Sequence, residues 1–171
     1  MVFGTGCILD SSRFVNVIAD YIGIGADVVN AQIIGEHGAS QIALWSKVTV
    51  AGMPIKEYCE TVGLKFNDQE KHMMEQRVLN MGTEIIKGKG KTNYGIATCV
   101  CYIADVILNR RATIASVSSI LNGEYGIHDI ALSLPCIINF DGVERRLEDK
   151  LNDTEYKQLV KSKKDISRFL K

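Results

Sequence analysis

The hydrophobic pattern of the chain changes once, after Asn109-Arg110-Arg111. Before this point apolar residues recur mainly at helical spacing, whereas later they form β-rich runs at residues 113–121, 130–140 and 143–147. Asp141-Gly142 separates the last two runs and is a strong signal for a hairpin turn. Because helices and strands do not alternate as βαβ units, this order predicts an α+β fold with mostly antiparallel strands.

Five helices are predicted, the first three in the N-terminal half. The first begins near Asp10 with Phe14 on its apolar face and ends at Gly23. A short one covers residues 53–62. The third begins at Asn67, which is followed three residues later by the acid of a capping-box pattern, and segment 87–92 is expected to break it. Its apolar stripe is expected to be Met74, Val78, Met81 and Ile85.

The last two helices are predicted from strongly apolar and strongly basic segments. The fourth has one apolar side that its surroundings are expected to cover, formed by Ala97, Val100, Cys101, Ala104, Ile107 and Leu108. The fifth is capped by residues 152–154. Its inward residues are expected to be Leu159, Ile166 and either Phe169 or Leu170, while its Lys and Arg side chains face water.

Size and charge narrow the class of protein. The 171 residues, 46% of them hydrophobic and 23% charged, fit one globular domain over residues 1–171. Lys and Arg together number 20, as do Asp and Glu, so the formal net charge is zero. We therefore expect neither the basic surface of a nucleic-acid binder nor a polybasic membrane-binding segment.

The cysteines and the apolar runs indicate the cellular compartment in which the chain is expected. Five cysteines are scattered without metal-ligand spacing, which favours buried free thiols and predicts no metal site; Cys99 and Cys101 should point to different faces of their helix. No apolar run approaches the roughly 18–20 residues of a membrane span, and the N-terminus does not resemble a signal peptide. A cytoplasmic location is expected.

Two glycine motifs resemble nucleotide-binding loops only in part. Gly4-Thr5-Gly6 lacks a preceding strand, and Leu9 occupies the position of the third glycine of a dinucleotide fingerprint. Gly90-Lys91-Thr92 resembles the end of a P-loop, but Ile85 stands where that motif requires glycine. We therefore predict no nucleotide-binding loop of the chain's own.

His37 is the strongest candidate for acid/base chemistry. It lies between Gly35 and Gly38 after a β-prone run, where glycines allow a ligand to approach closely. Asp10 and Arg13, three residues apart at a helix start, share a face; a carboxylate would stabilise imidazolium, and a guanidinium grips a substrate carboxylate. Taken singly, His37 could be a surface residue, and Asp10 and Arg13 an ordinary ion pair.

Several segments in the same order resemble the lactate/malate dehydrogenase family, specifically the C-terminal, substrate-binding half of a bacterial-type NAD-dependent L-lactate dehydrogenase. The resemblance is carried by GTGCILDSSRF, IIGEHGASQIALWSKVTVAG, GKTNYGIAT, SVSSILNGEYGIHDIALSLPCIIN and GVERRLEDKLNDTE. It extends from Phe3 to the last helix. The implied fold has twisted antiparallel strands packed against long helices, without the N-terminal Rossmann domain.

The resemblance implies a role for each candidate. His37 in GEHG corresponds to the proton donor and acceptor for the substrate C2 oxygen, and Asp10 in LDSSR to its carboxylate partner. Arg13 corresponds to the residue that pairs with the substrate carboxylate. These roles match what reduction of a ketone next to a carboxylate requires.

Other positions correspond to contacts around the substrate and cofactor. Thr92 matches the small hydroxylic residue beside the substrate, and Ile96 a residue against the nicotinamide ring. Thr5 stands where the family has Ser or Thr near the nicotinamide. The resemblance thus implies NAD as cofactor, held mainly by an N-terminal half that these residues do not include.

Three departures from the family pattern carry predictions. Val15 and Asn30 replace the basic residue and the histidine that hold fructose 1,6-bisphosphate in allosteric bacterial members, so weak or absent activation is expected. Ala39 replaces the usual Asp after GEHG, which leaves the hydrogen bonding of the loop in question. The third departure is the expected absence of the nucleotide-binding half, since Met1 stands where the family continues from a preceding strand. Without that half, we expect no significant dehydrogenase activity for the chain alone.

Alternatives remain open at this stage. Within the enzyme class, the chain could belong to a malate or an L-2-hydroxyisocaproate dehydrogenase, since the substrate-selecting lid lies outside it. As a homo-oligomer, it could also act only as a non-catalytic self-associating fragment, through an apolar face normally covered by the other half.

Overall fold

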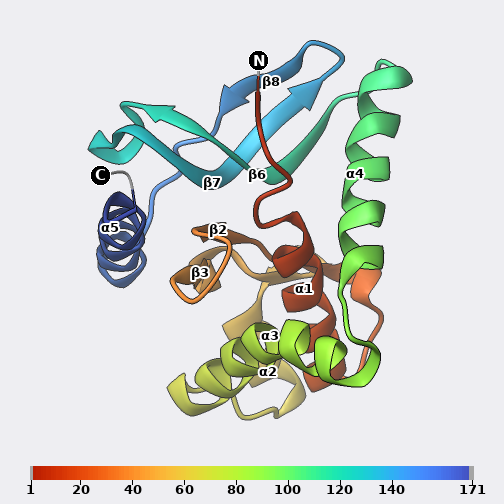
Figure 1. Cartoon of the computed structure of the whole chain (residues 1–171). Helices are drawn as coiled ribbons and strands as arrows, with labels where there is room; N and C mark the ends of the chain where they lie inside the picture. The colour runs from red at the N-terminus through yellow and green to blue at the C-terminus, as the bar shows by residue number, and fades with distance from the viewer. Residues whose placement is uncertain (1, 170–171) are drawn as a thin grey trace.

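The computed structural model describes residues 2–169 and contains five α-helices, two antiparallel sheets and three short 3₁₀ turns (Figure 1). The helices are α1 (Ile8–Ile22), α2 (Ile55–Val62), α3 (Asp68–Lys89), α4 (Asn93–Leu108) and α5 (Asp153–Ser167). The strands are β1 (Val29–Asn30), β2 (Ile33–Gly35), β3 (Gln41–Ala43), β4 (Thr49–Val50), β5 (Met53–Pro54), β6 (Thr113–Asn122), β7 (His128–Asn139) and β8 (Gly142–Arg146).

The larger sheet connects the two halves of the chain. Its order is β3-β2-β7-β6, with β8 also paired to β7, and all pairs are antiparallel. Strands β2 and β7 meet at one pair, Gly35 opposite Ser133. The loop that begins at Gly35 is thereby fixed beside the middle of the long β6–β7 hairpin. The small sheet β1-β4-β5 lies outside this arrangement.

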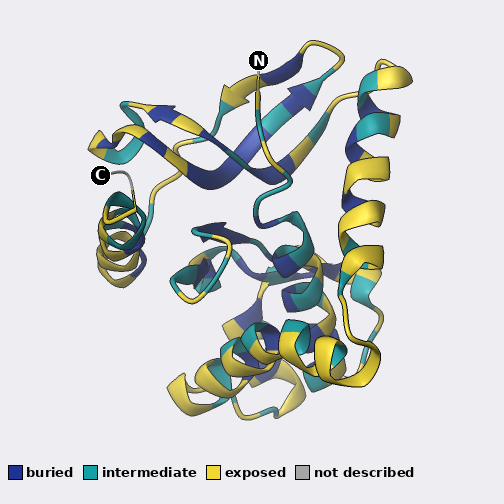
Figure 2. Cartoon of the chain, in the orientation of Figure 1, coloured by how far each residue is buried: buried dark blue, intermediate teal, exposed yellow. Residues whose placement is uncertain are grey.

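Three buried clusters form the core (Figure 2). The first surrounds α1 and α3 and includes Phe14, whose ring meets Trp45 edge-on at 4.7 Å between centroids. The second joins β2, β3 and β7 to α5 through Leu159. The third packs α4 against β6 and β7. Helices α4 and α5 therefore lie at opposite ends of the sheet (Figure 1).

The architecture confirms the α+β prediction, and most helix boundaries follow the local signals. Gly23 ends α1 with a left-handed φ of 74°, and the side chains of Asn67 and Asn152 cap α3 and α5. The predicted break of α3 within segment 87–92 is confirmed. Helix α3 continues through Lys89 and ends at Gly90, whose φ is 80°. No helix within residues 2–169 is both long and apolar enough to cross a membrane.

The predicted inward face of α4 is wrong. The buried residues of this helix are Cys99, Ile103 and Val106, whereas Val100 and Leu108 are 52% and 79% exposed. Ala97 and Cys101 are also exposed, and Ala104 and Ile107 are half-buried. Helix α4 is apolar on nearly every side, so its sequence did not identify the stripe that β6 and β7 cover.

Two smaller predictions also change. Cys99 and Cys101 do point to different faces, but Cys101 is exposed, so buried thiols are found at only four of the five cysteines; all five are free. On α5, Leu159 is fully buried and Ile166 half-buried, whereas Phe169 is 85% exposed. Leu170, the other candidate for the inward position, lies outside the described residues.

Candidate functional site

The first turn of α1 places Asp10 and Arg13. The chain enters this turn through Gly6, which has a φ of 49° and lies close to the sheet. A Cβ at Gly6 would lie 2.5 Å from both the Ser118 amide nitrogen and Ser133 Oγ, so this close approach requires glycine. Asp10 is only 3% exposed. Arg13, one turn later, brings Nη1 to 3.3 Å from Asp10 Oδ1, with only 13% of the Arg13 side chain exposed. The pair is therefore largely withdrawn from water.

His37 approaches Asp10 from the loop between β2 and β3. Its Nδ1 lies 2.5 Å from Asp10 Oδ2, while about half of the side chain, 51%, stays accessible. The hydrogen bond to Asp10 raises the pKa of His37 above its ordinary value of 6.5; burial and Arg13 oppose this rise, and the charges of Asp10 and Glu36 add to it. The carboxylate thus favours imidazolium and leaves Nε2 free to face a ligand.

These three side chains open onto a cavity of about 440 Å³. Its wall is formed by α1, the His37 loop, α3 and the start of α4: Leu9, Asp10, Arg13, His37, Gly38, Ala39, Gln41, Val78, Leu79, Gly82, Thr83, Ile86, Thr92 and Ile96. Arg13 is the only Lys or Arg in this set. One cation, one acid/base pair and an otherwise mostly apolar lining suit a small ligand with a single carboxylate.

Five of the six predicted site residues meet at this cavity. Asp10, Arg13, His37, Thr92 and Ile96 all line it. Thr5 does not belong to its wall; it lies just before α1, where its carbonyl accepts the Ile8 amide at 3.1 Å.

Sequence reasoning missed part of the wall. Gly82, on α3, lies against the Arg13 guanidinium: a Cβ there would lie 3.8 Å from Nη1, an ordinary van der Waals contact. Thr83 and Ile86 also belong to this wall. The apolar stripe predicted for α3 includes none of these three residues, although its member Val78 lines the same cavity.

A cysteine behind the site has a supporting position. The Cys7 thiol lies 3.9 Å from the Gly35 carbonyl oxygen and 3.7 Å from that of Glu36. Burial raises the pKa of Cys7 to about 12, so the thiol stays protonated at neutral pH. Cys7 is therefore a weak donor to the loop backbone and not a nucleophile.

Metal binding has no basis in the part of the chain that the structure describes. Over residues 2–169, no three His, Cys, Asp or Glu side chains gather in a way that could hold an ion.

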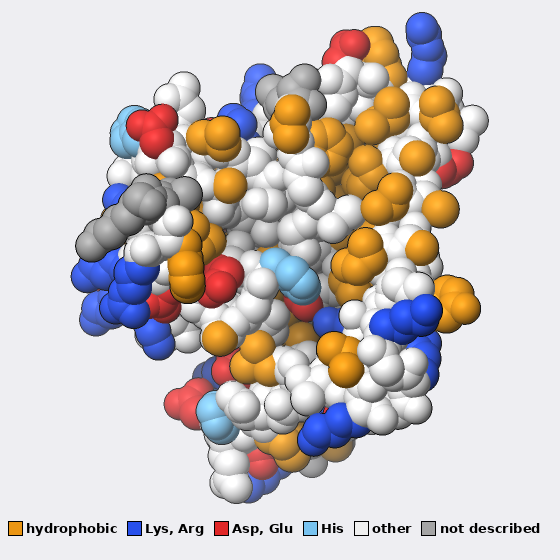
Figure 3. All heavy atoms as spheres, viewed as in Figure 1, with side chains coloured by type: hydrophobic (Ala, Val, Ile, Leu, Met, Phe, Trp, Pro, Cys, Tyr) orange, Lys and Arg blue, Asp and Glu red, His pale blue; other side chains and the backbone are white. Residues whose placement is uncertain are grey.

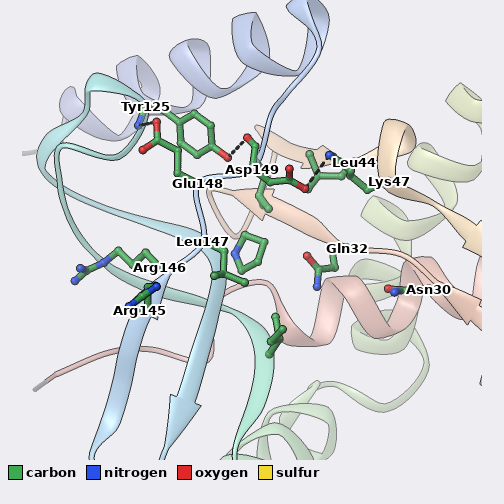
Figure 4. Close-up of a pocket in the computed structure, with 13 residues that line it drawn as sticks. Asn30, Gln32, Leu44, Lys47, Tyr125, Arg145, Arg146, Leu147, Glu148 and Asp149 are labelled. Carbon is green, nitrogen blue, oxygen red and sulfur yellow. Dashed lines mark hydrogen bonds and ion pairs between the residues drawn. The ribbon is translucent and has the colours of Figure 1, made fainter.

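A second cavity, of about 560 Å³, is lined by residues of β2, β7 and β8 and of the segment that follows β8 (Figure 4). Most of its charges are already paired. Lys47 Nζ is 2.8 Å from Asp149 Oδ2, and Glu148 accepts a hydrogen bond from the Tyr125 amide at 2.9 Å. Asn30 lines it as well. Nothing in its lining resembles the acid/base pair of the first cavity.

Comparison with known proteins places these observations in a family. The sequence profile of the lactate/malate dehydrogenase α/β C-terminal domain matches residues 7–171. An L-lactate dehydrogenase of Nitratidesulfovibrio vulgaris is 37% identical over 169 residues, 99% of this chain and 55% of the relative. One from Thermoanaerobacterium saccharolyticum is 41% identical over 154 residues, 90% of this chain and 50% of the relative.

Solved structures show the same fold. A lactate dehydrogenase from a Medee basin deep-sea metagenome library superposes with a TM-score of 0.93 at 32% identity, covering 99% of this chain and 54% of that one. The minor L-lactate dehydrogenase of Enterococcus mundtii, in a ligand-bound form, gives 0.92 at 35% identity with the same coverage. The chain thus spans about half the length of the relatives it matches.

Proposed function

We propose, from the premise that this chain belongs to the lactate/malate dehydrogenase family as its α/β C-terminal domain, that it supplies the substrate-binding and acid/base half of an NAD-dependent L-lactate dehydrogenase. The main support for this proposal is that Asp10, Arg13 and His37 lie together at one cavity. The relatives named above are L-lactate dehydrogenases, which supports pyruvate and L-lactate as the substrate pair.

Arg13 binds the substrate carboxylate in this proposal. Asp10 engages only Nη1, so the remaining guanidinium N–H groups can donate to a second carboxylate. Its low exposure strengthens such a charge-assisted pair, because less water competes for the donors. The bound carboxylate then fixes the position of the neighbouring carbonyl.

His37 moves the proton. As imidazolium, it donates the Nε2 proton to the C2 oxygen when pyruvate becomes lactate, and neutral His37 accepts that proton in the reverse direction. Asp10 holds Nδ1 and stabilises the positive charge. The raised pKa increases the share of imidazolium, the form needed for reduction.

NAD supplies the hydride acceptor, or the donor as NADH, when it is bound. Ile96, 39% exposed beside Thr92 at the cavity wall, offers an apolar surface that fits the flat nicotinamide ring. The chain's residues thus fit the reactive end of the cofactor, whereas its other parts would be held mainly outside these residues. Thr5 as a further contact remains a prediction.

The lining supplies one Lys or Arg, Arg13, which serves one substrate carboxylate. It does not separate pyruvate from oxaloacetate, because the resemblance places the substrate-selecting lid outside these residues. The apolar residues Val78, Leu79 and Ile86 do not by themselves separate pyruvate from the larger keto acid of an L-2-hydroxyisocaproate dehydrogenase. We propose pyruvate on the strength of the relatives.

The test uses the chain alone and joined to the N-terminal half of the Nitratidesulfovibrio vulgaris relative. The chain alone should not oxidise NADH with pyruvate, whereas the fusion should, with pyruvate preferred over oxaloacetate and 2-ketoisocaproate. His37→Asn in the fusion should abolish turnover. Preference for oxaloacetate, turnover by the chain alone, or an active His37→Asn variant would each contradict the proposal.

A direct binding measurement covers the case of a fusion that does not fold. Pyruvate added to the isotopically labelled chain should shift the His37 ring signals and the Arg13 side-chain signals. Arg13→Lys should weaken this binding, because one ammonium cannot reproduce a two-pronged contact. Signals that do not respond to pyruvate at millimolar concentration would contradict the substrate site.

A second candidate function is self-association as a homo-oligomer. Val100, Tyr102 and Leu108 on α4 are exposed, and Figure 3 shows hydrophobic side chains gathered along this helix. Light scattering over a concentration series tests it. Assembly that Leu108→Lys abolishes would support this function, and a monomer at every concentration would contradict it.

Two further expectations stay predictions. We propose that residues 1–171 unfold as one domain, which a single transition by two probes would support. We also propose weak or absent activation by fructose 1,6-bisphosphate, because Val15 and Asn30 lack positive charge. Rate measurements on the active fusion with and without the effector test the second expectation.

A further inference from the structure

The loop that carries His37 is held from behind by the C-terminal helix. Ser162 on α5 is fully buried, and its Oγ accepts the backbone N–H of Glu36 at 2.8 Å. The Ser40 hydroxyl reaches the same Oγ at 3.2 Å. One side chain, 126 positions from Glu36 in sequence, thus contacts the loop on both sides of His37.

The loop has a second internal tie. The Glu36 carboxylate accepts hydrogen bonds from both the Ser40 amide, at 3.3 Å, and the Ser40 hydroxyl. These bonds close residues 36–40 into a compact turn. They also answer the question raised by Ala39, because Glu36, Ser40 and Ser162 provide loop hydrogen bonds without a carboxylate at that position.

The close approach of α5 depends on Gly35. This glycine has a φ of 86°, and a Cβ at its position would lie 3.0 Å from Ser162 Oγ and 2.8 Å from Ile42 Cδ1. The backbone can therefore lie directly against the helix only because no side chain intervenes. Ser162 meets the loop one residue before His37.

We infer that Ser162 is a positioning residue for His37: its hydroxyl fixes the Glu36 backbone and thereby holds His37 Nδ1 at Asp10. Ser162 touches neither the ring nor the cavity wall, so its effect passes through the backbone. The significance of this for catalysis rests on the proposed function. The geometric claim can be tested without it.

Removing the hydroxyl should have a defined consequence. It leaves the partly buried Glu36 N–H without its acceptor, which favours movement of the loop toward water. The charged groups that face His37 are Asp10 and Arg13 from α1 and Glu36 from its own loop. Because the Asp10 hydrogen bond is the largest cause of the raised pKa of His37, a looser loop should lower that pKa toward 6.5.

The experiment is an NMR titration of the histidine rings in the chain and in Ser162→Ala. We expect a lower pKa for His37, with the signals of His72 and His128 as internal references. Hydrogen exchange of the Glu36 amide should become roughly tenfold faster, as loss of one hydrogen bond predicts.

Ser167→Ala is the matched control. It makes the same change on the same helix, but the Ser167 hydroxyl donates only to the Lys163 carbonyl, at 2.8 Å. Neither the pKa of His37 nor the exchange of Glu36 should change. Ser40→Ala removes the Ser40 contact with Ser162 together with the bond from the Ser40 hydroxyl to the Glu36 carboxylate, but keeps the Glu36 N–H bond to Ser162, and should give an intermediate fall in the pKa of His37.

A folded Ser162→Ala variant with the His37 pKa of the parent would overturn the inference. If that variant does not fold, Ser40→Ala decides, and an unchanged pKa there overturns it equally. The proposed function fails by a different observation, the absence of pyruvate turnover or binding. A lowered His37 pKa in a chain without pyruvate binding would support positioning by Ser162 and reject lactate chemistry.

Discussion

The two walls of the cavity differ in how firmly the structure holds them. Asp10 and the His37 loop form one wall, anchored to the sheet at Gly6 and Gly35 and to α5 through Ser162. The end of α3 and the start of α4 form the other wall, where Ile86 is 49% exposed and Ile96 39%. The groups that would move a proton are preorganised, whereas the surface that would meet the rest of the ligand is open.

This difference separates chemistry from recognition. A general acid requires its partner within hydrogen-bond distance, so burial of Asp10 and support from several elements serve His37 directly. Ile86 and Ile96 in the second wall are partly exposed and can adapt to what lies against them. We therefore expect substitutions in the first wall to affect proton transfer and stability, and those in the second to have smaller effects.

The largest effect is predicted for a substitution of Asp10, at the centre of the anchored wall. In the active fusion, Asp10→Asn should lower kcat/KM for pyruvate by about 10²–10⁴-fold, because the amide cannot stabilise imidazolium by charge. Steady-state kinetics measure it, and His37 titration in the same protein should show a lower pKa. A loss below tenfold would mean that Asp10 has only a structural role.

A matched pair of leucines tests the contrast in stability. Leu159→Ala, at a fully buried position behind the His37 loop, should lower the free energy of unfolding by about 3 kcal/mol. Leu108→Ala, at a position 79% exposed on α4, should change it by no more than about 0.5 kcal/mol. Urea unfolding measures both. Equal losses would show that the α4 face is covered in solution.

The pH dependence of stability reports on the His37–Asp10 bond. Because the pKa of His37 is raised by folding, the stabilisation is fully present below pH 6.5 and is lost as pH rises through the raised pKa. Urea titrations across this range should show the decrease in the parent chain. His37→Asn and Asp10→Asn should both remove this decrease in the free energy of unfolding with pH. If the decrease persists in either variant, it arises from other groups.

Local signals predicted elements better than they predicted contacts between elements. The caps at Asn67 and Asn152 and the stop at Gly23 follow from nearby residues, and the structure confirms them. The convergence of His37 with Asp10 came from family resemblance, not from spacing. Ser162 gave no signal at all, because one serine in a lysine-rich helix acquires its importance only when α5 meets the loop.

The buried stripe of α4 could not be predicted for a related reason. A helix that is apolar all round has no preferred face, so the choice of Cys99, Ile103 and Val106 depends on where β6 and β7 lie. By contrast, α3 has a polar side, and two residues of its predicted stripe, Met74 and Val78, are both 1% exposed, whereas Met81 and Ile85 are half-buried.

The smallest predicted effect concerns two glycines at the end of α3, next to the open wall. Gly88 lies inside the helix, and a Cβ at its position would have no atom within 4 Å, so Gly88→Ala should stabilise the chain by about 0.5–1 kcal/mol. Gly90, two residues later, has an equally open surrounding but a φ of 80°. Gly90→Ala should therefore destabilise by about 1 kcal/mol, because a Cβ is strained in the left-handed region. Stability changes of opposite sign for the two Gly→Ala variants would show that backbone conformation, not packing, decides the effect of a side chain at the end of α3. Changes of the same sign would contradict that view.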